Sequence, residues 1–156
     1  MIELFSSKKF SGSITIPSDK SISHRSAILN AVAFGEARIS NFSNGNDCLS
    51  TLNVLSNLGV NIEIENKNEF LNLKIIGNGF EGLTKPKTLL DAGNSGTTTR
   101  LMSGILASLN FETTITGDKS LNSSNSLWNI FGCALISQRG LKSKTLSKID
   151  IPIVKK

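Results

Sequence analysis

A polar stretch, PSDKSISHR over residues 17–25, stands between a short alternating apolar segment and a longer helical pattern. Apolar residues fall at every second position near the end of 10–16, which predicts a strand there. Pro17 has no N–H to donate to a sheet ladder, so we expect the strand to end at this residue. The apolar spacing over 22–34 predicts a helix, and Ser21 suits its N-cap position. The expected apolar face of this helix comprises Ile22, Leu29, Val32 and Ala33.

The start of this predicted helix has the composition of an anion-binding site. Lys20 and Arg25 flank its first turn, where unpaired backbone N–H groups and the positive end of the helix dipole favour anions. A Lys, an Arg and hydroxyl groups at one helix start suit a phosphate or a carboxylate. The same residues also occur as ordinary surface charges at a strand–helix connection, so a second signal is needed.

A second stretch, LDAGNSGTTTR over residues 90–100, repeats the design. It places a short strand before a glycine-rich turn and a second apolar helical pattern. Gly96 allows a ligand to approach the backbone closely, and Asn94 or Ser95 can cap the helix. Two units of this kind in one chain indicate an anion site more specifically than either does alone. The expected apolar face of this helix comprises Leu101, Met102, Ile105, Leu106 and Leu109.

Taken together, the two stretches resemble the 5-enolpyruvylshikimate-3-phosphate synthase family. The opening motif of that family is similar to residues 17–25, followed by a turn rich in Asn or Asp such as 41–47, and its second motif is similar to 93–100. The resemblance covers roughly residues 10–121. It implies an α+β fold of the enolpyruvyl-transferase type, in which βαβαββ units pack their helices inside an outer layer of mixed sheet. We expect an incomplete version of that fold.

The pattern between the two stretches predicts two strands after a second helix and one strand before it. Gly35 and Gly59 follow the two predicted helices and suit the left-handed conformation that often closes a helix. Asp47 suits the N-cap of the second helix. The expected strands are 37–42, 60–64 and 70–76, and the expected second helix is 49–58.

After a loop over residues 77–87 the pattern begins again. Residues 89–90 predict a strand, a helix follows, and the alternation over 111–115 predicts another strand. A predicted helix over 126–131 and strand over 134–137 echo the earlier helix–Gly–strand order. An internal repeat explains this order economically, and two unrelated units of a common type are the alternative.

The resemblance implies transfer of the enolpyruvyl group of phosphoenolpyruvate to the 5-hydroxyl of shikimate 3-phosphate, without metal or organic cofactor. By position, the resemblance implies that Lys20 contacts both substrates, while Ser21 and Arg25 hold shikimate 3-phosphate. It further implies that Gly96 contacts phosphoenolpyruvate through its backbone. The acid–base residues are not identified, and His24 is expected to be structural or exposed. Three further residues match the second motif and are expected to support its turn: Asn94, Thr97 and Arg100.

The resemblance fails beyond residue 121. The next motif of the family contains an Arg that binds phosphoenolpyruvate, whereas the aligned position here is Ser124, which cannot supply a bidentate cation. Well under half of the family's length is present. We therefore expect a partial enzyme that is inactive alone. The expected divisions are 1–18, edge strands and a hinge segment; 19–121, a partial repeat-unit domain; and 122–156, a divergent basic tail.

Charge and cysteine content exclude other classes of protein. Residues 139–156 hold six basic groups and one acidic group, which accounts for the net charge of +5, and the rest of the chain holds eleven of each sign. A nucleic-acid-binding domain spreads its basic residues over a face, so we expect no such partner. No apolar run or leader pattern indicates a membrane. Cys48 and Cys133 lack metal-site spacing, which predicts a reduced, cytoplasmic monomer without structural metal.

Other functions remain as alternatives. The sibling enolpyruvyl transferase that acts on UDP-N-acetylglucosamine has Asn where this chain has Ser21, and a loop cysteine that neither Cys48 nor Cys133 matches. A folded remnant with weak anion binding is the non-enzymatic alternative. A nucleotide-binding loop over 93–99 is disfavoured because it lacks the Lys that a P-loop requires. A separate chain that supplies the missing part is the alternative to an enzyme that stays incomplete.

Overall fold

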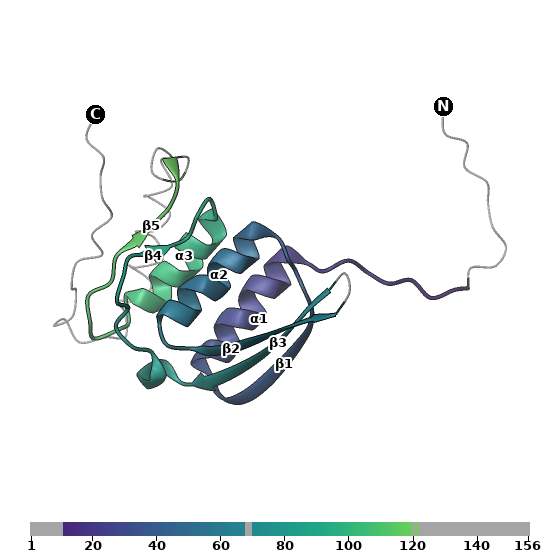
Figure 1. Ribbon diagram of the computed structural model, residues 1–156, viewed down its shortest axis with the longest axis horizontal. Helices are drawn as coiled ribbons and strands as arrows, with labels where there is room; N and C mark the ends of the chain where they lie inside the picture. The colour runs from purple at the N-terminus through teal and green to yellow at the C-terminus, as the bar shows by residue number, and fades with distance from the viewer. Residues whose placement is uncertain (1–10, 68–69, 120, 122–156) are drawn as a thin grey trace.

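The computed structural model describes residues 11–67, 70–119 and 121. Within these residues, two helices and a three-stranded sheet precede a third helix and a two-stranded sheet (Figure 1). The helices are α1 (Lys20–Val32), α2 (Asn46–Asn57), the short 3₁₀ helix η1 (Phe80–Gly82) and α3 (Gly96–Leu106). The strands are β1 (Phe34–Phe42), β2 (Asn61–Lys67), β3 (Phe70–Asn78), β4 (Leu90–Asp91) and β5 (Ile115–Thr116).

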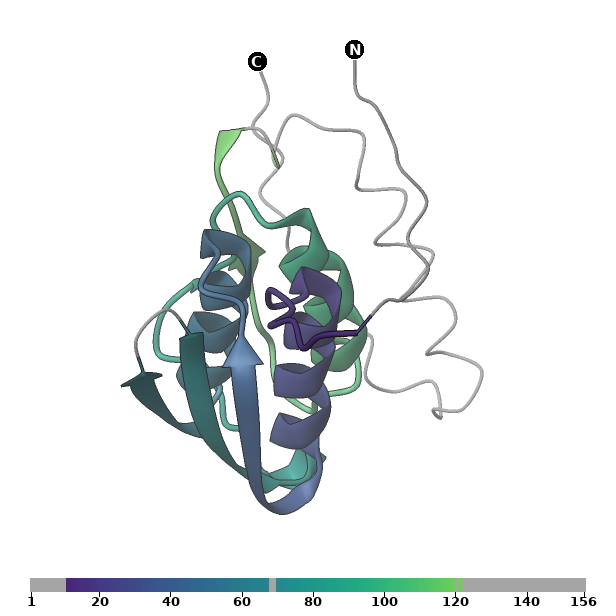
Figure 2. The same ribbon diagram turned by 90° about the vertical axis from the view of Figure 1, so that its right-hand side faces the viewer.

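Helices α1 and α2 cover one face of the three-stranded sheet, and α3 lies beside α2 (Figures 1 and 2). The sheet has the order β1-β3-β2, with both outer strands antiparallel to β3. Strand β4 pairs in parallel with β5. This is the mixed helix-and-sheet arrangement expected from the sequence, and the described residues include the start of a second unit.

The alternation of β3 determines which face of the sheet meets the helices. Leu73 and Ile75 are buried, at 2% and 0% exposure. Lys74, between them, points to the other face, where its Nζ lies 3.6 Å from Glu36 Oε2 and 3.5 Å from Glu63 Oε2. One face of β3 is therefore core, and the opposite face carries charged groups from all three strands.

The buried face of α1 is different from the predicted one. Ile22 and Leu29 are 68% and 64% exposed. The prediction that these two residues lie on the buried face of the helix is therefore wrong. The helix turns its small residues inward instead, because they allow its backbone to approach the sheet closely. The buried residues of α1 are Ser23, His24, Ala27, Ile28 and Ala31.

The helix also begins differently. Asp19, and not Ser21, is the N-cap of α1: its Oδ1 accepts the N–H of Ile22 at 2.7 Å. A carboxylate is favoured over a hydroxyl here because it also neutralises the positive end of the helix dipole.

The strand predicted over 10–16 is wrong for the described residues 11–16, which have no regular secondary structure. Ile14 and Ile16 are 86% and 68% exposed. Alternation alone does not make a strand, because a strand also needs a neighbour for its backbone. In the described part of the chain, the first unit therefore begins with α1.

Other predicted boundaries are partly confirmed. Gly59 does close α2, with a φ of 88°. Gly35 lies inside β1 instead, because α1 already ends at Ala33. Asp47 is in the first turn of α2, and Gly45 is the N-cap residue. The strand expected over 111–115 is shorter and shifted, and the elements predicted over 126–131 and 134–137 lie outside the described residues.

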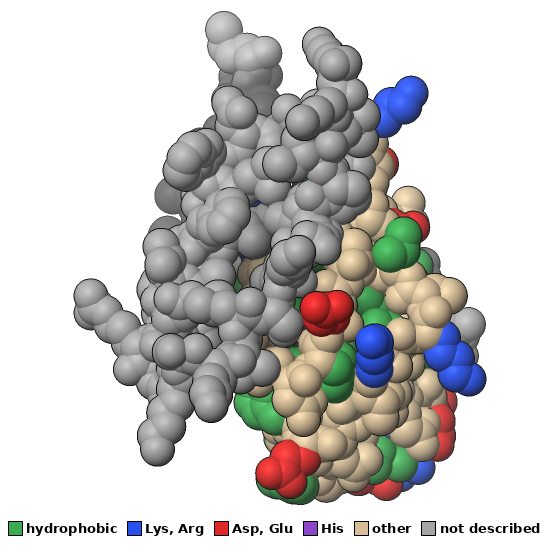
Figure 3. Space-filling model, turned by 90° about the vertical axis from the view of Figure 1, so that its left-hand side faces the viewer, with side chains coloured by type: hydrophobic (Ala, Val, Ile, Leu, Met, Phe, Trp, Pro, Cys, Tyr) green, Lys and Arg blue, Asp and Glu red, His purple; other side chains and the backbone are tan. Residues whose placement is uncertain are grey.

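None of the described helices has both the length and the apolar character needed to cross a bilayer. On the face of the molecule shown in Figure 3, the described acidic and basic side chains are scattered singly among polar and apolar ones. That part of the surface therefore has no basic stripe of the kind that follows a nucleic-acid backbone.

Gly77 tests the close approach of α1 to β3, and Gly104 serves as a control away from that contact. A Cβ on Gly77, in β3, would lie 2.2 Å from Asn30 O and 2.4 Å from Ala33 O, which are backbone atoms of α1 and its C-cap. We expect Gly77→Ala to lower the free energy of unfolding by about 1–3 kcal/mol or more. Gly104→Ala, within α3 with no atom in the way, should raise it by up to about 1 kcal/mol. Urea unfolding followed by circular dichroism measures both, and equal effects would contradict this packing.

Candidate anion site at three helix starts

Helices α1, α2 and α3 begin at the same end of the molecule (Figure 1). Asp47, in the first turn of α2, connects the other two. Its carboxylate forms an ion pair with Lys20 Nζ, and its backbone carbonyl accepts the hydroxyl of Thr98 at 3.2 Å. The positive ends of three helix dipoles therefore meet around one residue, an arrangement that favours a bound anion.

The predicted residues of α1 occupy two neighbouring faces at the helix start. Ser21 and Arg25 are four residues apart, so they share one face, and both are exposed. Lys20 lies on the face toward α2, where it meets Asp47. Its side chain is 54% exposed. Because exposed ion pairs contribute only about 0–1 kcal/mol, an anionic ligand can replace Asp47 as the partner of Lys20.

Gly96 is the first residue of α3 and is half-buried. A Cβ at this position would meet Leu121 Cδ2 at 3.6 Å, an ordinary van der Waals distance. Among the described residues, packing therefore does not require glycine here. The N–H groups of this first turn are also those that lack partners within the helix.

The other residues of the second motif take supporting positions. Ser95, and not Asn94, caps α3, because its Oγ accepts the N–H of Thr98 at 3.1 Å. Asn94 and Arg100 are exposed at either side of the first turn, and Thr97 is half-buried. The structure thus groups the predicted residues at two helix starts that Asp47 connects.

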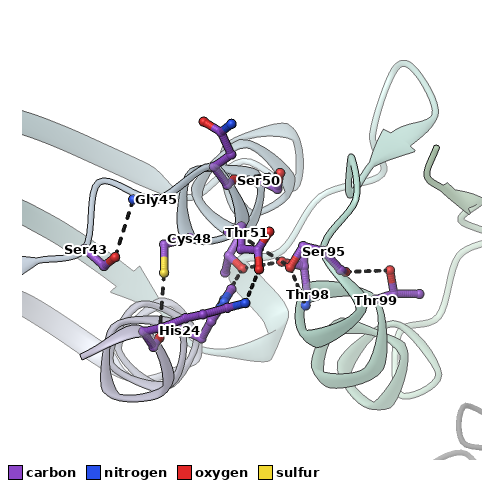
Figure 4. Close-up of polar contacts among 12 residues, drawn as sticks. His24, Ser43, Gly45, Cys48, Ser50, Thr51, Ser95, Thr98 and Thr99 are labelled. Carbon is purple, nitrogen blue, oxygen red and sulfur yellow. Dashed lines mark hydrogen bonds and ion pairs between the residues drawn. The ribbon is translucent and has the colours of Figure 1, made fainter. Parts of the chain in front are cut away.

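Beneath the Lys20–Asp47 ion pair lies a chain of buried hydrogen bonds (Figure 4). His24 Nδ1 lies 2.7 Å from Thr51 Oγ1, which lies 2.7 Å from Thr98 Oγ1. The Thr98 hydroxyl also contacts Ser95 Oγ at 2.7 Å. His24, Thr51 and Thr98 come from α1, α2 and α3, and each is fully buried. The three helix starts are therefore joined by side-chain hydrogen bonds.

Sequence reasoning missed this chain, although a signal was present. His24 follows Lys20 by four residues, and Thr51 follows Asp47 by four, so each pair shares a helix face. The two helices therefore meet in two successive levels, an exposed ion pair and a buried hydrogen bond. The sequence alone does not indicate that these two helix faces lie opposite each other.

The two buried titratable groups near this site are held neutral. Burial lowers the pKa of His24, and Lys20 lowers it further, while Asp47 raises it. Burial raises the pKa of the Cys48 thiol, against smaller opposing effects of Ser43 and Lys20. A buried, protonated thiol is a poor nucleophile, so Cys48 lacks the properties of a reactive cysteine. Cys133 lies outside the described residues.

The neutral state of His24 makes stability depend on pH. The unfolded chain takes up a proton near pH 6.5, whereas the folded chain resists protonation until the pH is lower. Above pH 6.5 the stability is therefore complete, and it is lost as the pH falls below that value, with a slope of at most one proton. Chemical unfolding at several pH values between 5 and 7.5 measures the slope. His24→Asn should remove it, and an unchanged slope in that variant would assign it to other groups.

Comparison with known proteins agrees with these features. The family model of EPSP synthase (3-phosphoshikimate 1-carboxyvinyltransferase) matches residues 5–123. The 3-phosphoshikimate 1-carboxyvinyltransferase of Enterococcus faecalis is 50% identical over 114 residues, which are 73% of this chain and 26% of that protein. The corresponding protein of Desulforamulus reducens is 51% identical over 114 residues, with the same coverage. A solved EPSP synthase from Acinetobacter baumannii matches with a TM-score of 0.67 and 42% identity, over 72% of this chain and 25% of that chain.

The fold and the helix-start site thus define an enolpyruvyl-transferase unit. More specifically, the chain belongs to the EPSP synthase (3-phosphoshikimate 1-carboxyvinyltransferase) family. It spans about a quarter of the length of the curated relatives that it matches. The resemblance seen in the two motifs and the expected fold class are confirmed.

Proposed function

We propose that this chain is part of an enzyme that transfers the enolpyruvyl group of phosphoenolpyruvate to the 5-hydroxyl of shikimate 3-phosphate. The observation that carries the proposal is the meeting of three helix starts at Asp47. One start carries Lys20, Ser21 and Arg25, and another begins at Gly96. Both substrates are anions, so cations, hydroxyls and backbone N–H groups at helix starts are what they require.

The proposed roles follow from position. Lys20 contacts both substrates, because it lies on the face of α1 turned toward α2 and the connected start of α3. Ser21 and Arg25, on the neighbouring face, bind shikimate 3-phosphate. Gly96 receives phosphoenolpyruvate at the N–H groups of α3. The residues that support the second turn are Asn94, Thr97 and Arg100.

We propose further that residues 1–156 are inactive by themselves and require the remaining part of the length of their relatives. Three observations support this. The chain spans about a quarter of those relatives. Position 124 is Ser and not a cation. Ile22 and Leu29 are seven residues apart on the outer face of α1, exposed beside the site.

The remaining parts of the proposal concern the whole protein. We propose a cytoplasmic location, and the division into residues 1–18, 19–121 and 122–156 given above. The second candidate function is a folded remnant that binds anions weakly, and the substitution of Ser124 for the family's Arg favours it. The two candidates differ in whether a complementary chain restores turnover.

Binding of shikimate 3-phosphate tests the site. We expect Lys20→Ala and Arg25→Ala each to weaken binding about tenfold or more, because each removes a charged hydrogen-bond donor to the phosphate. Arg38→Ala is the matched control: this exposed Arg lies on β1 and pairs with Glu36, 3.1 Å away. Isothermal titration calorimetry measures the three dissociation constants. Equal losses in all three variants would show nonspecific attraction and contradict the assigned site.

Turnover tests the incomplete enzyme. The purified chain with both substrates should release no more phosphate than Lys20→Ala, since we expect general acid–base groups and further cations in the part of the relatives that this chain does not match. Addition of a chain carrying the part of the Enterococcus faecalis relative that this chain does not match should restore phosphate release. Turnover by the chain alone would overturn the partial-enzyme proposal, and failure of the mixture would favour the remnant.

A further inference from the structure

The sequence contains one histidine, His24, and the structure buries it completely. Its Nδ1 meets Thr51, while its Nε2 is buried without a hydrogen-bond partner in the described part of the chain. A buried polar atom without a partner is costly, and the cost depends on its protonation state. The tautomer of His24 is therefore decided by the hydrogen bonds on the other side of the ring.

Counting protons along the chain determines that tautomer. The Thr98 hydroxyl has one hydrogen, and its two acceptors other than Thr51 are Ser95 Oγ at 2.7 Å and the Asp47 carbonyl at 3.2 Å. With that hydrogen used, we assign Thr98 Oγ1 as the acceptor of its contact with Thr51, in which either oxygen can donate, and the single hydrogen of Thr51 is thereby used. Thr51 Oγ1 must in turn accept from His24, so the proton resides on Nδ1. The unpartnered Nε2 carries only a lone pair.

We propose that His24 is a positioning residue for the anion site. As the Nδ1–H tautomer, it is the first donor in a chain that runs through Thr51 to Thr98, whose hydroxyl lies 3.2 Å from the backbone carbonyl of Asp47, and so it sets the position of Lys20 relative to the start of α3. This inference rests on the proposed function for the identity of the anion. Its structural part, a directed hydrogen-bond chain across three helices, does not.

The mechanism is the alignment of helix starts. His24 and Lys20 share a face of α1, and Thr51 and Asp47 share the opposing face of α2. Without the buried hydrogen bond between His24 and Thr51, the starts of α1 and α2 can separate. Lys20 and the N–H groups of α3 can then no longer contact the same anion. Positioning errors of this kind reduce binding of multiply charged ligands because several contacts are lost together.

Protonation of Nε2 would break the same alignment. The charged groups near the ring are Lys20 on its own helix and Asp47 on α2. On the strands packed against α1, Glu36 and Lys74 pair with each other on the far face of the sheet, and Arg100 of α3 is exposed. No acceptor among the described residues meets an Nε2–H, so the charged ring is disfavoured in this position.

The first experiment reads the tautomer directly. Because there is one histidine, long-range ¹H–¹⁵N spectra of the intact labelled chain give one imidazole signal set without assignment. At pH 7.5 and without ligand, we expect a protonated Nδ1 and a bare Nε2. An Nε2–H tautomer, or rapid averaging of the two, would overturn the proposal whether or not the chain binds shikimate 3-phosphate.

The second experiment separates positioning from folding. His24→Asn keeps an N–H donor near the Nδ1 position and does not titrate, whereas His24→Leu keeps apolar volume without the donor. We expect dissociation constants for shikimate 3-phosphate within about threefold of the wild type for Asn, and tenfold or more weaker for Leu. Thr51→Val, which interrupts the chain one residue later, replaces His24→Leu if the latter does not fold. Equal affinity of the Leu and wild-type chains, or equal loss in Asn and Leu, would overturn the proposal.

The pH profile adds a signature that a merely structural role does not have. The ratio of wild-type to His24→Asn affinity cancels titration of the ligand phosphate. We expect this ratio to fall once the pH falls below the lowered pKa of His24 in the folded chain, and a ratio that stays constant while the His24 ring signals titrate contradicts the proposal. If the wild-type chain does not bind the ligand, the proposed function fails. Amide shifts of Lys20 and Gly96 then decide the positioning role, because they should move in His24→Leu and not in His24→Asn.

Discussion

The close approach of α1 to the sheet determines where the residues of the site lie. Ala27 and Ala31 face the core, and Gly77 of β3 receives the end of the helix so closely that a Cβ has no room. This contact orients α1 along its whole length. Because the helix is rigid, contact at its C-terminal end also places Lys20 at the other end beside α2. A packing constraint far from the anion site thus controls its geometry.

Polar contacts then fix the relative positions of the helices more closely than apolar packing does. Apolar contacts are not directional, so they place helices only approximately. The hydrogen bonds from His24 through Thr51 to Thr98 have short, specific distances and fix the helices relative to one another. Each hydroxyl in this buried chain depends on its neighbour for a hydrogen-bond partner, which makes the chain sensitive to each side chain in it. The site therefore combines an exposed ion pair, which can change partners, with buried hydrogen bonds of specific geometry.

The sequence predicted the features that depend on local chemistry. Glycine-closed α2, the alternating strands β2 and β3, and the Ser95 cap of α3 each follow from a few neighbouring residues. The two motifs also predicted an anion site, and that site stays a prediction. The local predictions were accurate because turn, cap and periodicity signals are properties of short segments.

Apart from the N-caps of α1 and α2, which are Asp19 and Gly45, the remaining errors concern features that depend on partners distant in the sequence. The face that α1 buries is chosen by close contact with β3, and large apolar residues such as Leu29 are left outside. The segment before Pro17 alternates like a strand but has no strand beside it in the described residues. Thr51 and Thr98 are ordinary helix residues until the fold brings them to His24. Short-range patterns contain no information on any of these.

The exposed outer face of α1 has a thermodynamic consequence for any chain that covers it. Ile22 and Leu29 lie on the same helix as Ser21 and Arg25, so a partner and a phosphate ligand would each restrict the same element. Two events that order one helix are coupled, because the second needs less ordering than the first. The coupling is reciprocal: whatever factor the ligand adds to the affinity of the partner, the partner adds to that of the ligand. Assembly and substrate recognition would then both depend on the same conformational equilibrium, the ordering of the start of α1.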